Sequence, residues 1–247
     1  MSVLIRDVGL SELSGIEITL GTGVTYLAIK PGFREATMIC DTAWRLALCP
    51  RLVHALYYDT AATSYTEYVN SVVDGSSSTH MPLDAMATND IVYLGVTMPA
   101  LGFYFDVGSN VNANAATLDV EYCSTAMSGS ATIAFTDVAS DSDGTTSGGA
   151  TLAQDGAYTF TLPSVKRSRL GTYGTPLFSR AYWYRFLPSA TLSATVDINE
   201  IIPIYQTSSY GYMSASTEYT IPFDVAEVGG IMVSGTNTKH IYLTWIK

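Results

Sequence analysis

Apolar and polar residues alternate with a period of two through much of this chain, and this pattern restricts the possible folds more than any other feature of the sequence. The segment 116–122 has Ala, Leu, Val and Tyr at its even positions and Thr, Asp and Glu at its odd positions. The segments 182–187, 192–199 and 241–245 repeat the alternation. Because successive side chains of a β-strand point to opposite faces, these segments are predicted strands with one buried face.

Runs of β-branched and aromatic residues predict further strands, and helical periodicity is nearly absent. The runs are 16–20, 24–30, 55–58, 91–96, 101–107, 131–136, 157–162 and 231–234. Gly21 to Gly23 is expected to close a hairpin between two of the first strands, and Pro82 to Met86 is expected to form one helical turn. Many short strands at regular spacing predict an all-β protein, with an antiparallel β-sandwich or jelly-roll-like main domain.

The strand pattern and the loop composition divide the chain into three blocks. Residues 1–50 are expected to form an N-terminal β segment, 51–205 the main β-sandwich domain, and 206–247 a C-terminal β segment. The last block begins with the polar, Tyr-rich stretch 206–216.

The chain has few charges for its size. Charged residues make up 14% of it, against roughly 25% in an average soluble domain, while 47% is hydrophobic and 17 residues are Tyr. A monomer with this composition would expose much apolar and Tyr-rich surface, so we expect other subunits to cover part of it. The chain is therefore expected to form a homo-oligomer. A rigid secreted monomer coated with Ser and Thr is the alternative.

The net charge of −10 disfavours two classes of partner. Nucleic-acid binding needs basic patches that displace counterions from phosphates, and docking on an anionic membrane needs basic residues too. No secretory signal is visible in the first thirty residues. Cys40, Cys49 and Cys123 are too few and too irregular for a disulfide framework, so we expect buried, reduced thiols and synthesis in a cytoplasm.

No local pattern of catalytic or metal-binding residues stands out. His54, His80 and His240 lie far apart without metal-ligand spacing, and no Ser lies in a G-x-S-x-G turn. The Asp-x-Asp-Gly loop at 141–144 lacks acidic residues at the ends of an EF-hand frame, so we expect a flexible polar turn. We predict no enzyme activity, no cofactor and no metal. A glycosidase carboxylate pair or a Cys–His pair is the remaining catalytic alternative.

Positive charge is concentrated in one stretch of the sequence. Five of the twelve basic residues lie within twenty positions: Lys166, Arg167, Arg169, Arg180 and Arg185. We interpret the first four as candidate contacts with an acidic partner surface. The alternative is a solvated loop in which an Arg pairs with Asp197 or Glu200.

Tyrosines gather around the start of the C-terminal block, at 205, 210, 212 and 219. Tyrosine is enriched in protein interfaces and also stacks on sugars. Tyr210 and Tyr212 are therefore added to the candidate partner contacts.

Several motifs between residues 90 and 205 resemble a known module. They are Phe-x-Phe-Asp-Val-Gly at 103–108, Ala-Ala-Thr-Leu-x-Val-Glu-Tyr at 115–122, Asp-Gly-Thr at 143–145, Thr-Phe-Thr-Leu-Pro at 159–163, Tyr-Trp-Tyr-Arg-Phe at 182–186 and Ser-Ala-x-Leu-Ser-Ala-Thr-Val-x-Ile at 189–198. The set resembles a β-sandwich module of virion structural proteins in tailed bacteriophages. The family often has a Trp after the tyrosine that corresponds to Tyr122, and Cys123 stands there instead.

The resemblance implies a bacteriophage virion protein that is made in the host cytoplasm and works by subunit contact. Its most specific form is a capsid decoration (cement) protein, a homotrimer that binds and stabilises the lattice of the major capsid protein. A tail or baseplate subunit is the alternative among virion proteins. A carbohydrate-binding or receptor-binding β-sandwich module is the alternative from another class.

Overall fold

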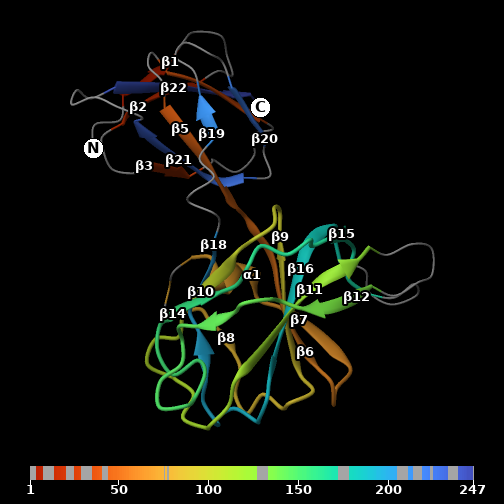
Figure 1. Cartoon of the computed structure of the whole chain (residues 1–247). Helices are drawn as coiled ribbons and strands as arrows, with labels where there is room; N and C mark the ends of the chain where they lie inside the picture. The colour runs from red at the N-terminus through yellow and green to blue at the C-terminus, as the bar shows by residue number, and fades with distance from the viewer. Residues whose placement is uncertain are drawn as a thin grey trace. The chain divides into compact units, whose positions relative to one another are not determined.

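The chain forms two compact units (Figure 1), a main unit of Leu52–Tyr205 and a terminal unit of Met1–Arg51 with Gln206–Lys247. The computed structural model describes residues 51–74, 76, 78–126, 133–171 and 178–204 with their side chains; in 1–50 and 205–247 it describes the backbone of the strands. All pairs of named strands are antiparallel, which confirms the predicted all-β, antiparallel fold. The sandwich or jelly-roll arrangement stays a prediction.

Both ends of the chain build the terminal unit, although the sequence pattern separates them into two blocks. One sheet has the order β1 (Leu4–Asp7), β2 (Ser14–Leu20), β22 (Lys239–Ile246), β4 (Glu35–Cys40), β20 (Tyr219–Pro222). The other has the order β19 (Gly211–Met213), β5 (Trp44–Pro50), β21 (Val225–Met232), β3 (Thr25–Ala28). Since β2 and β3 belong to different sheets, the predicted hairpin between them is wrong.

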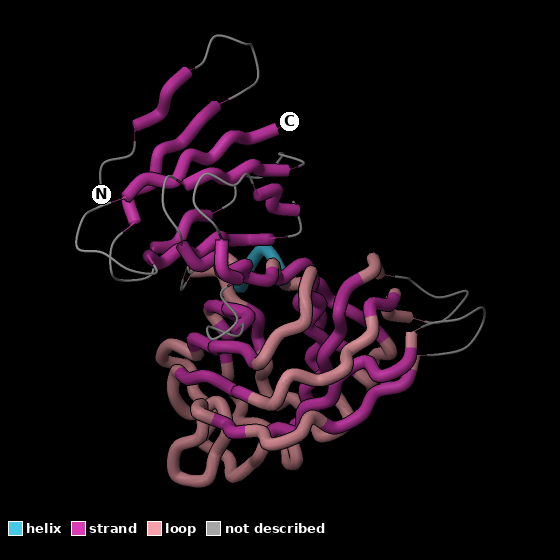
Figure 2. Tube along the Cα trace, turned by 45° about the horizontal axis from the view of Figure 1, so that its top comes forward, coloured by secondary structure: helices cyan, strands magenta, loops and turns pink. Residues whose placement is uncertain are grey.

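The main unit contains two larger sheets and a short strand pair (Figure 2). The first sheet has the order β12 (Ala134–Asp137), β11 (Leu118–Thr125), β16 (Ala181–Pro188), β9 (Ile91–Val96), β6 (Leu52–Asp59), β7 (Ser64–Glu67), and β15 (Arg167–Ser168) pairs with β16. The second has the order β13 (Ser142–Asp143), β14 (Gly156–Thr159), β10 (Gly102–Asp106), β18 (Glu200–Ile204). The pair joins β8 (Met81–Pro82) to β17 (Asp197–Ile198).

Aromatic side chains from both larger sheets meet in one core. The ring of Phe103 on β10 lies 5.3 Å from the ring of Tyr184 and 5.6 Å from that of Phe186, both on β16, measured between centroids. The buried Tyr184 hydroxyl accepts a hydrogen bond from the Ala100 amide at 2.9 Å and donates one to its carbonyl at 3.1 Å. Burial raises the pKa of Tyr184 above its ordinary value, so the hydroxyl stays neutral.

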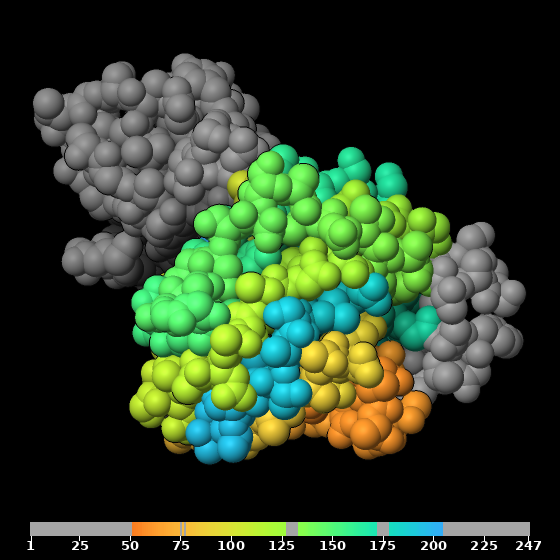
Figure 3. Space-filling model, turned by 60° about the horizontal axis from the view of Figure 1, so that its bottom comes forward, coloured from red at the N-terminus to blue at the C-terminus, as the bar shows by residue number. Residues whose placement is uncertain are grey.

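The segment 192–199 shows why alternation alone can mislead. Leu192 and Val196 are buried as the pattern predicts, yet only Asp197–Ile198 forms a strand. The Leu192 amide donates to the Met86 carbonyl at 3.1 Å, and the Val196 amide donates to a carboxylate oxygen of Asp84 at 2.9 Å. Figure 3 shows this blue segment lying between the yellow and yellow-green segments, which fits these bonds and the one from the Asp197 amide to the Asn110 carbonyl. The strand predicted across 192–196 is therefore wrong.

The helix prediction is also wrong. After β8 the chain makes a turn in which the Met86 amide donates to the Leu83 carbonyl at 3.1 Å, and Ala85 has a φ of 49°. A residue in the left-handed region ends a right-handed helix. The one described helix is α1 (Val69–Val72), too short to leave a periodic signal in the sequence. No helix among the residues described with side chains is long and apolar enough to span a membrane.

The polar loop at 141–149 is tied down by its own side chains. The Asp143 carboxylate accepts hydrogen bonds from the hydroxyl of Thr145 at 2.6 Å, of Thr146 at 2.9 Å and of Thr151 at 2.6 Å. It also accepts one from the Thr145 amide at 2.9 Å. Thr145 and Thr151 are fully buried, so this loop is a bonded part of the main unit rather than the free polar turn that its composition predicts.

Candidate functional site

The basic cluster seen in the sequence lies around β15, a short strand that is anchored by a buried tryptophan. Arg167 of β15 pairs with Tyr182 of β16, and Ser168 pairs with Ala181. The indole Nε1 of Trp183, which is fully buried, donates to the Ser168 carbonyl at 2.9 Å. Since this bond joins β15 to the core, the backbone that carries Arg167 is held in place.

Four cations lie on or beside this strand, and the name basic strip is used below for Lys166, Arg167, Arg169 and Arg180. All four side chains are exposed. Ser168 is buried between Arg167 and Arg169, as strand alternation requires, so both arginines point outward. Continuing the β15–β16 register by one position brings Arg169 opposite Arg180.

Two backbone hydrogen bonds fix the ends of the strip. The Lys166 amide donates to the Cys123 carbonyl of β11 at 2.8 Å. The Phe178 amide donates to the Leu170 carbonyl at 3.0 Å, which brings the chain before Arg180 back beside the chain after Arg169. Residues far apart in the sequence therefore contribute to one surface.

The fifth basic residue of the cluster, Arg185, does not belong to the strip. Its guanidinium forms an ion pair with Glu121 of β11 and lies 4.6 Å from the ring centre of Phe135 on β12. The sequence alternative of a pair with Asp197 or Glu200 is therefore wrong for Arg185, whose partner is Glu121.

The strip cations are not neutralised by neighbouring acids in the part of the chain described with side chains. The three ion pairs found there join His54 to Glu67, His80 to Asp197, and Arg185 to Glu121. None of them includes a strip residue. Ammonium and guanidinium groups that carry no partner carboxylate attract one from outside, and the planar guanidinium binds it with two parallel hydrogen bonds.

The two tyrosine candidates belong to the terminal unit. Tyr210 lies outside the described residues. Tyr212 lies on β19, opposite Arg45 of β5 in the terminal unit, and its side chain is outside the description. Their role in partner contact stays a prediction.

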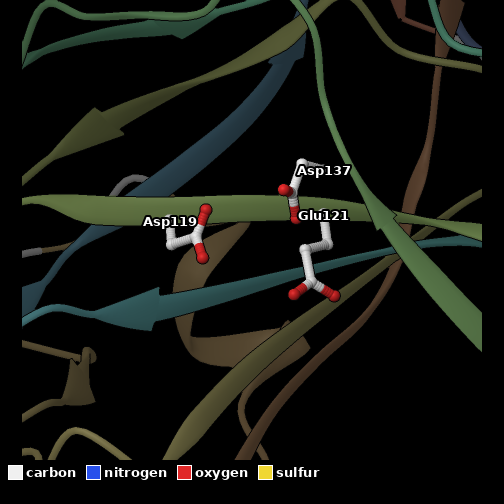
Figure 4. Close-up of side chains that lie close together, drawn as sticks. All are labelled: Asp119, Glu121 and Asp137. Atoms are coloured by element: carbon white, nitrogen blue, oxygen red, sulfur yellow. The ribbon is translucent and has the colours of Figure 1, made fainter.

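Three carboxylates meet on the neighbouring strands, a group that the sequence does not single out (Figure 4). Asp119 and Glu121 share one face of β11, and Asp137 of β12 pairs with Glu121. One ligand oxygen from each lies within 4.8 Å of the others. Arg185 supplies a positive charge to Glu121, and the ion pairs among the described side chains include neither Asp119 nor Asp137. The spacing of two positions between Asp119 and Glu121 is the sequence feature that indicates carboxylates on one face of a strand.

The cysteines and most of the histidines noted in the sequence lie on several different strands. Burial raises the pKa of the Cys123 thiol to about 11, so this cysteine carries no thiolate near neutral pH. Cys40, Cys49 and His240 lie on terminal-unit strands whose side chains are outside the description. His54 contacts Ser179 and Glu67, a juxtaposition that no sequence spacing reveals.

Comparisons with protein-family models, with curated proteins and with solved structures found no match to this chain.

Proposed function

We propose that this chain is a structural subunit that docks on an acidic protein surface through the basic strip. The observation that carries the proposal is the exposure of four cations, on and beside a strand fixed to the core by Trp183, without a carboxylate partner among the described side chains. Exposed charge of one sign steers a partner of the opposite sign and sets its orientation.

The charge distribution of the main unit supports the same proposal. Leu52–Tyr205 contains five basic and fourteen acidic residues, a net charge of −9, and all five basic residues lie between Lys166 and Arg185. A surface of this kind repels acidic partners everywhere except at the strip. The strip therefore selects one orientation on such a partner.

The specific form of the proposal is a bacteriophage capsid decoration protein that binds the major capsid protein as a homotrimer. The resemblance at 90–205 motivates it, and the low charge content supports coverage by other subunits. The tail or baseplate alternative shares the same docking chemistry. The carbohydrate-binding alternative depends on tyrosines around 210, and nothing in the described residues favours it.

Particle composition tests the specific form. Virus particles purified from the source of this sequence are digested, and the copy number of the chain is measured by mass spectrometry against labelled peptides. Hundreds of copies per particle agree with a head or tail-tube position, and a handful favours the baseplate. Absence of the chain from purified particles would rule out the virion proposal.

Oligomeric state gives an independent test. Light scattering coupled to size exclusion is expected to show a trimer of the 26.5 kDa chain. A hexamer keeps the assembly proposal and favours the tail. A clean monomer across micromolar concentrations contradicts the homo-oligomer.

A further inference from the structure

Ser179, His54 and Glu67 form a chain of two short side-chain hydrogen bonds on the main unit. The His54 Nε2 lies 2.6 Å from the Ser179 Oγ, and its Nδ1 lies 2.7 Å from the Glu67 Oε2. His54 is on β6, Glu67 ends β7, and Ser179 lies two positions before the first residue of β16. A hydroxyl, an imidazole and a carboxylate in this order are the parts of an activated serine nucleophile.

The carboxylate determines which imidazole nitrogen holds the proton. An ionised carboxylate only accepts hydrogen bonds, so the Nδ1 of His54 donates to Glu67. In the neutral ring the Nε2 is then the acceptor, and the Ser179 hydroxyl donates to it. This is the tautomer in which His54 can remove the proton from Ser179.

Glu67 is itself held in position by the backbone. Its Oε1 accepts hydrogen bonds from the Ala55 amide at 2.8 Å and from the Val69 amide at 3.2 Å. Because β6 and β7 are paired antiparallel strands, the carboxylate has a fixed place beside His54. Glu67 is a positioning residue for the imidazole.

Aromatic rings hold the imidazole on two sides. The ring of Trp183 stacks on that of His54 with 5.1 Å between centroids and 18° between planes. The ring of Phe178 meets it edge-on at 5.8 Å. The His54 side chain is 16% exposed, whereas Ser179 is exposed, so the base is fixed while the hydroxyl is open to a substrate.

We propose that Ser179 is a nucleophile for acyl transfer, with His54 as its base and a carboxylic ester as the substrate class. This activity goes beyond docking and does not depend on it. The Ser179 oxygen forms a bond to the ester carbonyl carbon while its proton passes to His54 Nε2. The ester C–O bond breaks, and the leaving alkoxide takes that proton from His54. Water then forms a bond to the acyl carbon while one of its protons passes to His54. The bond between that carbon and the Ser179 oxygen breaks, Ser179 takes the proton back from His54, and a carboxylic acid is released.

A fluorophosphonate probe tests the nucleophile on the full chain. Ser179 displaces fluoride from phosphorus, the proton of the hydroxyl passes to His54, and a stable phosphonyl-serine remains. The expected result is one adduct per chain, located on Ser179 by peptide mass spectrometry. Ser179→Ala is expected to abolish labelling, and the matched control Ser109→Ala, at another exposed serine, is expected to keep it.

Two further variants separate chemistry from folding. His54→Phe keeps an aromatic ring against Trp183 and removes both nitrogens, and labelling is expected to fall by about a hundredfold or more. Glu67→Gln is expected to lower kcat for p-nitrophenyl acetate by about tenfold or more with KM unchanged. The substitution disturbs the tautomer of His54 and leaves the binding of the substrate as it is. An unlabelled Ser179 in the wild type, or labelling that His54→Phe leaves unchanged in a folded chain, would overturn the proposal.

Discussion

The two units of this chain differ in how they distribute charge. The main unit has a net charge of −9, and its basic residues occupy one stretch of twenty positions. The terminal unit contains seven basic and eight acidic residues, a net charge of −1, and its basic residues are spread from Arg6 to Lys247. Charge-directed contact is therefore proposed for the main unit.

The units also differ in how the chain builds them. The main unit uses one continuous stretch, whereas the terminal unit joins strands from both ends of the chain. In the terminal unit, β22 lies between β2 and β4 and pairs with both. The terminal unit therefore depends on its last strand, and the main unit does not.

Removal of residues 239–247 tests that difference and has the largest expected effect. Without β22, the strands β2 and β4 lose their common partner, so their slow hydrogen exchange is expected to disappear. The strands β9 and β16 of the main unit are expected to keep their protection. Hydrogen exchange followed by mass spectrometry measures both units in one sample, and persistent protection of β2 and β4 would contradict the observed strand order.

Trp183→Ala is expected to destabilise the main unit by about 3–5 kcal/mol. The substitution leaves a cavity in the core and removes the indole donor from the Ser168 carbonyl. Trp183→Phe fills most of the cavity and is expected to cost less. Denaturant unfolding gives both values. A loss below about 1 kcal/mol for the alanine variant would mean that β15 is anchored in another way.

Asp90 gives the main unit an expected dependence on pH. Burial acts to raise the pKa of Asp90, but hydrogen bonds from the amides of Thr60 and Ala87 and the hydroxyl of Tyr57 outweigh it and lower the pKa below its usual value. A lowered folded pKa means that the stabilisation is complete above about pH 4 and is lost as the pH falls through the folded pKa.

Asp90→Asn is the matching variant, and it is expected to cost about 1–3 kcal/mol at pH 7. Its stability is expected to fall less steeply in acid than that of the wild type. Unfolding curves between pH 2 and 7, taken on both proteins, measure the difference. Parallel curves would show that Asp90 does not contribute to the acid sensitivity.

The sequence predicts those features that depend on local pattern. The run of β-branched and aromatic residues places β9 at Ile91–Val96, as the structure has it, and the composition of 166–185 identifies the basic strip. In the structure Arg185 does not belong to the strip, because it forms an ion pair with Glu121 on the neighbouring strand. Nothing within twenty positions of Arg185 signals that pairing.

The remaining features depend on contacts between distant segments. Ser179 and His54 are 125 positions apart and meet where the chain before β16 lies beside β6. Leu192 and Val196 alternate like a strand, but their backbone bonds go to the turn at 83–86 and not to a ladder. The alternation of apolar residues indicates which side chains are buried. It does not indicate which groups accept the hydrogen bonds of the backbone amides.

Docking on purified particles depleted of this chain tests the role of the basic strip most directly. The triple substitution Lys166→Gln, Arg167→Gln and Arg169→Gln is compared with Thr88→Glu, Ser109→Glu and Ala115→Glu, which changes net charge equally at exposed positions away from the strip. Arg185→Gln serves as a second control, because Arg185 already pairs with Glu121.

We expect the strip variant to associate about tenfold more slowly at low salt, both controls to dock at close to the wild-type rate, and added salt to remove the difference. Equal docking by the strip variant and the wild type at low salt would contradict a docking role for the basic strip.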